Sequence, residues 1–207
     1  MLQNNLEAMI DGVFPVTEER LVHLNDEIVR FGKLLNNLDR LKEFETESMK
    51  LNFHSIDLLT MLENLYGDFL AEAENKNISL QFTKEENADY LILGDADKLK
   101  QVFINLVNNA IKFTGSSGEI SISLYRNGKK IFAEIKDSGI GIKKEDMPFV
   151  FERMYRADKS RHETQGNGIG LTIVKNILDL HSASIDVESE VGSGTLFKIS
   201  FNASDDK

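Results

Sequence analysis

Apolar residues recur in alternating steps of three and four in the first quarter of the chain. From Thr17 onward they stand at Leu21, Leu24, Ile28, Phe31, Leu35 and Leu38, which is the a/d spacing of a helix that packs in a bundle or coiled coil. Thr17 is a suitable N-cap, and Asp11, Gly12 and Pro15 interrupt the chain before it. This order predicts an antiparallel helical hairpin. The spacing alone fits a packing hairpin as well as a dimer seam.

Beyond this hairpin, the pattern mixes short strands with helices. The stretch LNFHSIDLL changes the register, and an amphipathic helix is then predicted by Leu58, Leu62, Leu65, Phe69 and Leu70, before the strand-like ISLQF. Two more helices are predicted, over residues 95–113 and 168–181. We place the domain boundary near Asn52, so that residues 1–51 form the hairpin and residues 52–207 form a second domain.

Two β-hairpins are predicted in the second domain. EISISLY and KKIFAEIKD alternate apolar with polar residues and are joined by Asn127 and Gly128, a strong signal for a two-residue hairpin turn. IDVES and TLFKISF form a second pair around Gly192, Ser193 and Gly194. Strands and helices in this order predict the α+β class, as a two-layer α/β sandwich preceded by the helical hairpin.

Composition and charge exclude several classes of function. The chain has 34 acidic and 24 basic residues, a formal net charge of -10 and a pI near 4.9. It should repel polyanions, so we expect no nucleic-acid partner. The absence of cysteine excludes disulfides, cysteine-ligated zinc and thiol catalysis. No apolar run reaches the roughly 18 to 20 residues that span a bilayer, and the first residues do not resemble a secretory signal. We therefore expect no direct membrane contact.

A polar stripe marks the predicted helix QVFINLVNNAIKFT. Asn105, Asn109 and Lys112 are spaced by four and three and share one face, whereas Val102 and Leu106 belong to an apolar face. Asparagine is a poor helix former, so its repetition indicates that this face needs polar groups. A carboxamide oxygen can complete the shell of Mg²⁺, and a lysine can meet phosphate charge. An ordinary solvated face is the alternative.

An aspartate ends the second strand of the first hairpin. Ile131, Ala133 and Ile135 point one way, and Asp137 follows in the same phase, so its carboxylate should aim at the apolar side. A buried carboxylate needs donors, and the exocyclic amine of a purine could supply one. The glycines of DSGIGI would let a flat base approach the backbone. Alternatively, Asp137 only caps a turn, which is common for Asp before Gly.

A basic stretch and a glycine-rich helix entry follow. PFVFERMYRADKSRHETQGNGIGL contains four cations, at Arg153, Arg156, Lys159 and Arg161, and then three glycines, at Gly166, Gly168 and Gly170. Glycines before a helix offer free N–H groups and the positive end of the helix dipole to phosphate. The basic stretch is typical of a lid that closes over an anion. On its own, GNGIG is a weak signal, because glycine loops are more often plain turns.

The segments QVFINLVNNAIKFT, DSGIGI, FERMYR, GNGIGL and GSGT occur together in this order. The set resembles the N, G1, F, G2 and G3 boxes of the ATP-binding catalytic domain of sensor histidine kinases, from two-component systems, over about Asp57 to Phe201. The resemblance implies a Bergerat-type ATP-binding fold, ATP and Mg²⁺ as cofactors, and transfer of the γ-phosphate of ATP to a histidine.

The resemblance also implies a role for each matching residue. Asn109 would coordinate Mg²⁺, and Phe113 would pack beside the adenine ring. Asp137 would accept a hydrogen bond from the adenine amine. The implied catalytic residues are Arg156, which would neutralise charge on the terminal phosphate, Lys112 and Asn105. The other implied ATP-binding residues are Gly139, Gly141, Ile142, Gly166, Gly168, Gly170, Leu171 and Thr195, with Gly192 and Gly194 lining the far side.

The segment EAMIDGVFPVTEERL resembles the turn and second helix of the family's dimerisation and phosphotransfer hairpin. The acceptor-histidine box of the family belongs before this segment, so we expect a truncated hairpin that cannot phosphorylate itself. Of its own histidines, His162 is the nearest rival, because Glu163 follows it. The implied partners are an acceptor histidine of the parent protein and the receiver domain of a response regulator. The parent is expected to be a homodimer that is anchored to a membrane, with this part in the cytoplasm.

Two other classes of protein share this type of ATP site. One is the ATP-hydrolysing conformational machine of the gyrase, chaperone or mismatch-repair type, and the other is a serine-kinase-type regulator. The machines resemble the same fold but carry a glutamate that orients the attacking water where this chain has Asn105. A carboxamide cannot accept that proton. The heptad hairpin gives a further reason to favour the histidine kinase.

Overall fold

The structure is a computed structural model that describes residues 9, 11–17, 20–22, 24–25, 51–152, 155 and 169–204. The chain divides into two compact units, Met1–Glu47 and Ser48–Lys207. In the first unit, the hydroxyl of Thr17 accepts a hydrogen bond from the Arg20 N–H at 3.4 Å, and the Leu21 N–H donates to the Thr17 carbonyl at 3.0 Å. Thr17 therefore caps a helical turn, as its sequence position predicts. The rest of the predicted heptad helix falls largely outside the described residues.

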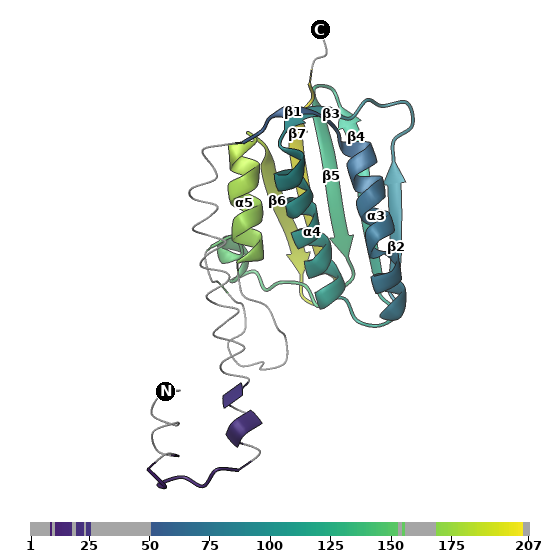
Figure 1. Cartoon of the computed structure of the whole chain (residues 1–207). Coiled ribbons are helices and arrows are strands. Elements are labelled where there is room, and N and C mark those ends of the chain that lie inside the picture. Colours follow the sequence, from purple (N-terminus) through teal and green to yellow (C-terminus); the bar gives the residue numbers. More distant parts are fainter. Residues whose placement is uncertain are drawn as a thin grey trace. The chain divides into compact units, whose positions relative to one another are not determined.

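The second unit is built on a five-stranded sheet with the order β2-β4-β5-β7-β6. The strands are β2 (Ser79–Lys84), β4 (Glu119–Asn127), β5 (Lys130–Asp137), β6 (Ser184–Glu190) and β7 (Gly194–Asn202). Strands β2 and β4 are parallel, and the other neighbours are antiparallel. Three helices cover one face of this sheet (Figure 1): α3 (Leu58–Asn75), α4 (Ala96–Phe113) and α5 (Gly170–Leu180). This confirms the predicted α+β sandwich.

A core fills the space between the helices and the sheet. Helix α4 buries seven residues: Leu99, Val102, Phe103, Leu106, Val107, Ala110 and Ile111. The sheet meets them with alternate residues, because Ile131, Ala133 and Ile135 of β5 are all fully buried. Among the residues that the structure describes, no helix is long and apolar enough to cross a membrane.

A small second sheet was not predicted. Strand β1 (His54–Asp57) pairs antiparallel with β3 (Leu91–Gly94), whereas the sequence around His54 indicated only a change of register. A single turn of 3-10 helix, η1 (Met147–Phe149), precedes the basic stretch. The strands are only four residues long, which is too short for a clear period-two pattern.

The turn of the first hairpin lies one position later than expected. Asn127 pairs with Lys130, so the two turn residues are Gly128 and Lys129, not Asn127 and Gly128. Gly128 has φ +60°, which suits the first central position of a type II′ turn. Asn127 therefore belongs to the strand pairing and not to the turn.

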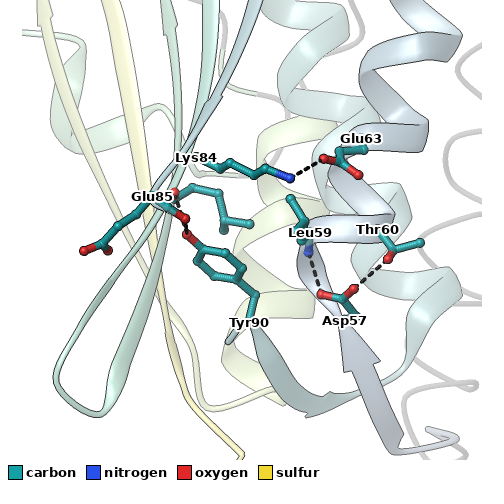
Figure 2. A network of polar contacts seen from close by, with 8 residues as sticks. Asp57, Leu59, Thr60, Glu63, Lys84, Glu85 and Tyr90 are labelled. Atoms are coloured by element: carbon teal, nitrogen blue, oxygen red, sulfur yellow. Dashed lines mark hydrogen bonds and ion pairs between the residues drawn. The ribbon is translucent and has the colours of Figure 1, made fainter. Parts of the chain in front are cut away.

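Polar contacts fix the loop that leads into β3 (Figure 2). The buried Tyr90 hydroxyl lies 2.9 Å from the Glu85 carbonyl and 3.2 Å from the Leu124 carbonyl. Asp57 caps α3 by accepting from the Leu59 N–H at 3.0 Å, and Lys84 of β2 pairs with Glu63 of α3 at 2.8 Å. These contacts hold α3 and the loop to the sheet at a distance from the boxes identified in the sequence.

Candidate ATP-binding site

Asp137 lies buried at the end of the central strand β5, with 6% of its surface exposed. Its Oδ1 accepts hydrogen bonds from the Gly139 N–H at 2.8 Å and the Thr195 N–H at 3.3 Å. Burial raises the pKa of Asp137, and the two N–H groups lower it by a smaller amount. The bond to Gly139 is the turn-capping contact that the sequence offered as an alternative. The bond to Thr195 adds an anchor from the neighbouring strand.

The loop after Asp137, residues 138–142, is held by backbone contacts on both sides. The Ile140 N–H donates to the Phe113 carbonyl at the end of α4, 3.2 Å away, and the Gly192 N–H donates to the Ile140 carbonyl at 2.9 Å. The Ile142 N–H donates to the Ser189 hydroxyl at 2.8 Å. This arrangement fixes the loop between α4 and the β6–β7 turn, at the lower edge of the sheet in Figure 1.

Three glycines around Asp137 lie where an added Cβ would come too close to neighbouring backbone: Gly139, Gly141 and Gly194. A Cβ on Gly141 (φ +69°) would lie 2.0 Å from the Glu190 carbonyl oxygen, and one on Gly194 (φ +97°) would lie 1.9 Å from the Asp137 carbonyl oxygen. Gly141 and Gly194 thus have a positive φ and also lie against another segment of the same chain. The glycines of DSGIGI and GSGT thus let the loop and the β6–β7 turn pack directly together.

The polar stripe of α4 runs toward this loop and toward the start of α5. Asn105, Asn109, Lys112 and Phe113 are all half-buried. The Lys112 Nζ lies 4.7 Å from the centre of the Phe113 ring. A Cβ added to Gly170, the first residue of α5, would lie 3.8 Å from Asn105 Oδ1, so the middle of α4 faces the N-terminal end of α5.

The structure describes the end of the glycine-rich entry only. Helix α5 begins at Gly170, two residues later than predicted, and Leu171 lies in its first turn; no side-chain cap bond is made at Ile169. Gly166, Gly168 and Arg156 lie outside the described residues. Tyr155, which precedes Arg156, donates a hydrogen bond to Asp146 Oδ1, and this bond raises the pKa of Tyr155 to about 12.

The residues fit a nucleotide and a hard cation. The Asn105 Nδ2 is buried and has no hydrogen-bond partner among the described residues, so it can serve an oxygen of a ligand. No group of three or more His, Cys, Asp or Glu side chains that could hold a metal lies in the described part of the chain. A magnesium ion here would combine the carboxamide oxygen of a residue such as Asn109 with water and phosphate oxygens, since Mg²⁺ takes oxygen ligands and is often held by substrate phosphates.

Sequence reasoning missed Ser189, which contacts both the loop and Thr195. A usable signal was present, because counting back around the Gly192–Gly194 turn pairs Ser189 with Thr195, as the structure does. The link between Asp146 and Tyr155 was also missed, and no motif in the sequence predicts it.

Comparisons with known proteins agree with this geometry. The family model described as histidine kinase-, DNA gyrase B- and HSP90-like ATPase matches residues 94–205. The sensor protein SrrB of Staphylococcus aureus is 33% identical over 207 residues, which cover 96% of this chain and 34% of SrrB. The chain thus spans about a third of the length of this relative.

Solved structures show the same architecture. The catalytic domain of the histidine kinase ThkA superposes with a TM-score of 0.64 at 30% identity, over 73% of this chain and 95% of that one. ThkA in complex with the response regulator protein TrrA gives a TM-score of 0.67 at 23% identity, over 98% of this chain and 59% of that one. The family match, the relative and the fold agree: the chain belongs to the histidine kinase-, DNA gyrase B- and HSP90-like ATPase family and carries the ATP-binding catalytic domain of a sensor histidine kinase.

Proposed function

We propose that the second unit binds ATP with Mg²⁺ and transfers the γ-phosphate to a histidine of its parent protein. The observation that carries the proposal is the buried carboxylate of Asp137, whose hydrogen bonds to the described residues both end on Oδ1. The amine of adenine is a suitable donor for this carboxylate. Gly141 and Gly194 allow the backbone segments next to this carboxylate to pack closely together.

The phosphate end of the nucleotide is assigned to the facing parts of α4 and α5. Asn109 would hold the Mg²⁺, and the Nδ2 of Asn105, which has no partner among the described residues, would meet a phosphate oxygen. Lys112 would add positive charge, and Gly170 and Leu171 would present N–H groups at the N-terminal end of α5. When bound, Mg²⁺ supplies neutralisation of charge on the phosphate oxygens. Arg156 would add the same effect on the terminal phosphate, and Gly166 and Gly168 would complete the cradle.

The adenine end is assigned to Asp137, Gly139, Gly141, Ile142 and Thr195, with Phe113 beside the ring. All six residues meet at the end of β5, because Phe113 and Ile142 are hydrogen-bonded into the same loop through their backbone. The chain's own contribution is to orient the nucleotide so that its terminal phosphate is available to an acceptor.

Within the described residues, the histidines give little support for self-phosphorylation. His181 has both ring nitrogens engaged: Nε2 accepts from the Asp95 N–H at 2.9 Å and Nδ1 donates to the Ile177 carbonyl at 2.7 Å. His54 is exposed on strand β1, with its Nδ1 3.0 Å from the Asn52 carbonyl. His23 and His162 lie outside the described residues. We infer that the acceptor is a histidine elsewhere in the parent protein.

The proposed onward partner is the receiver domain of a response regulator. The solved complex of ThkA with the response regulator protein TrrA supports a partner of this kind. A homodimeric parent that is anchored to a membrane, with this domain in the cytoplasm, belongs to the same proposal.

The experiment is to incubate the chain with Mg²⁺ and γ-labelled ATP, alone and with a separate histidine-bearing dimerisation hairpin of its parent. We expect acid-labile label on the added hairpin only. At ATP concentrations near the wild-type Kd, the Asp137→Asn variant should label it far more weakly. Label on the chain itself that disappears in His162→Ala would contradict the inference about self-phosphorylation, and label on neither protein would contradict the kinase.

A further inference from the structure

A row of polar side chains crosses three strands at the end of the sheet where Asp137 lies. Asp137 of β5 stands opposite Thr195 of β7, and Thr195 stands opposite Ser189 of β6. Side chains that are directly opposed across strands lie on the same face, and Asp137 and Thr195 are both buried. The Ser189 and Thr195 hydroxyl oxygens are 3.0 Å apart. The row therefore forms a continuous polar edge beside the proposed adenine position.

The direction of each hydrogen bond in this row follows from counting protons. The Ser189 hydroxyl accepts from the Ile142 N–H at 2.8 Å and lies 2.7 Å from the Gly194 carbonyl. A carbonyl cannot donate, so the single Ser189 proton points to Gly194. The bond between Ser189 and Thr195 must then be donated by Thr195. Its proton is used, and its hydroxyl oxygen has only lone pairs left.

We propose that Ser189 is a positioning residue for purine selection, because it takes the Thr195 proton and leaves the row with hydrogen-bond acceptors only. An acceptor-only edge favours a purine that carries an amino group at C6 and disfavours one that carries an oxygen there. The proposal rests on the proposed function, since it concerns the same nucleotide site. Ser189 itself acts through Thr195 and is not assigned a contact with the nucleotide.

A purely structural role for Ser189 has a different consequence. If its hydroxyl only pins the loop at Ile142, its loss weakens the binding of every purine nucleotide alike. If it directs the Thr195 proton, its loss lets that hydroxyl rotate and donate to a C6 oxygen. The ratio of affinities for two purines then changes, not only their absolute values.

The experiment compares ATP with inosine triphosphate, which carries an oxygen in place of the C6 amine and a proton on N1. Calorimetry would give the Kd of each nucleotide, with Mg²⁺, for the wild type and for Ser189→Ala, Ser189→Thr and Ser184→Ala. Ser184→Ala is the matched control, because it removes a hydroxyl on the same strand that contacts Ser200 at 3.1 Å, at the other end of β6. Ser189→Thr keeps the hydroxyl and should restore wild-type behaviour.

We expect the wild type and Ser184→Ala to share one preference for ATP, and Ser189→Ala to lower it by about fivefold or more, as expected for one redirected hydrogen bond. An unchanged ratio in a folded Ser189→Ala overturns the role of Ser189 and leaves the proposed function standing. A wild type that binds neither nucleotide overturns the proposed function itself. If Ser189→Ala does not fold, Thr195→Val replaces it, and an unchanged ratio there overturns the inference equally.

Discussion

At the residue scale, we expect Asp137 to favour nucleotide binding at the expense of stability. Its carboxylate is buried, and burial raises its pKa above the ordinary value of 3.8. A carboxyl group whose folded pKa exceeds its unfolded pKa binds protons more readily in the native state. Its ionisation therefore lowers the free energy of unfolding as the pH rises from the unfolded pKa through the folded pKa. A ligand that donates a hydrogen bond to it would offset this cost.

The first prediction follows from the raised pKa of Asp137. Between pH 3.8 and neutrality, the free energy of unfolding of the wild type should fall relative to that of Asp137→Asn, because the amide does not ionise. Urea unfolding of both proteins, without nucleotide, at several pH values measures this difference. A difference that moves in favour of the wild type as the pH rises would contradict the burial argument.

The second prediction concerns Asn109 and the metal. Mg²⁺ should strengthen ATP binding to the wild type, and Asn109→Ala should reduce this gain by about tenfold, as expected when metal coordination is weakened. Asn108→Ala is the control, because Asn108 is the exposed neighbour on the same helix. Titrations with and without Mg²⁺ decide the matter. Full magnesium dependence in Asn109→Ala would remove this residue from the metal site.

At the scale of elements, the site depends on how closely two loops approach each other. The loop of residues 138–142 packs on the β6–β7 turn through Gly141, where a Cβ would meet the Glu190 carbonyl oxygen at 2.0 Å. Gly128 has a similar left-handed backbone, with φ +60°, but nothing lies within 4 Å of its added Cβ. Comparing alanine variants at the two positions therefore separates the cost of a positive φ from the cost of the close approach.

The third prediction uses this pair. Gly128→Ala should lower the free energy of unfolding by about 1 to 3 kcal/mol, the cost of a positive-φ turn conformation for a residue with a Cβ. Gly141→Ala should cost more than this and should also weaken ATP binding, because the loop must shift away from the turn. Urea unfolding and calorimetry measure both effects. Equal costs for the two variants, with ATP affinity intact, would show that the close approach is unimportant.

At the scale of the whole molecule, periodicity predicted the elements that carry long apolar patterns. Helices α3, α4 and α5 and strands β2, β4, β5, β6 and β7 were all anticipated, as was the buried phase of Asp137. Strands β1 and β3 were missed, because four residues are too few to establish alternation and their pairing joins positions such as Ser55 and Leu93 that are distant in the sequence. Long-range pairing of this kind leaves no local signal.

The site was predicted in the same uneven way. Asn105, Asn109 and Lys112 could be placed on one face because helical spacing fixes their relation. The turn could have paired Ser189 with Thr195, but it could not reveal the role of Ser189, which comes from its three hydrogen bonds to Ile142, Gly194 and Thr195. The assignments of Arg156, Gly166 and Gly168 still rest on the family resemblance and stay predictions.

The central claim is that ATP binds beside Asp137, and titration calorimetry of ATP with Mg²⁺ into the wild type and Asp137→Asn tests it most directly. Circular dichroism would establish that both proteins are folded. We predict that the wild type binds and that Asp137→Asn binds roughly ten- to a hundredfold more weakly, because a hydrogen bond to a charged group is worth about 1.5 to 3 kcal/mol. Equal affinity of the two folded proteins for ATP would contradict the account.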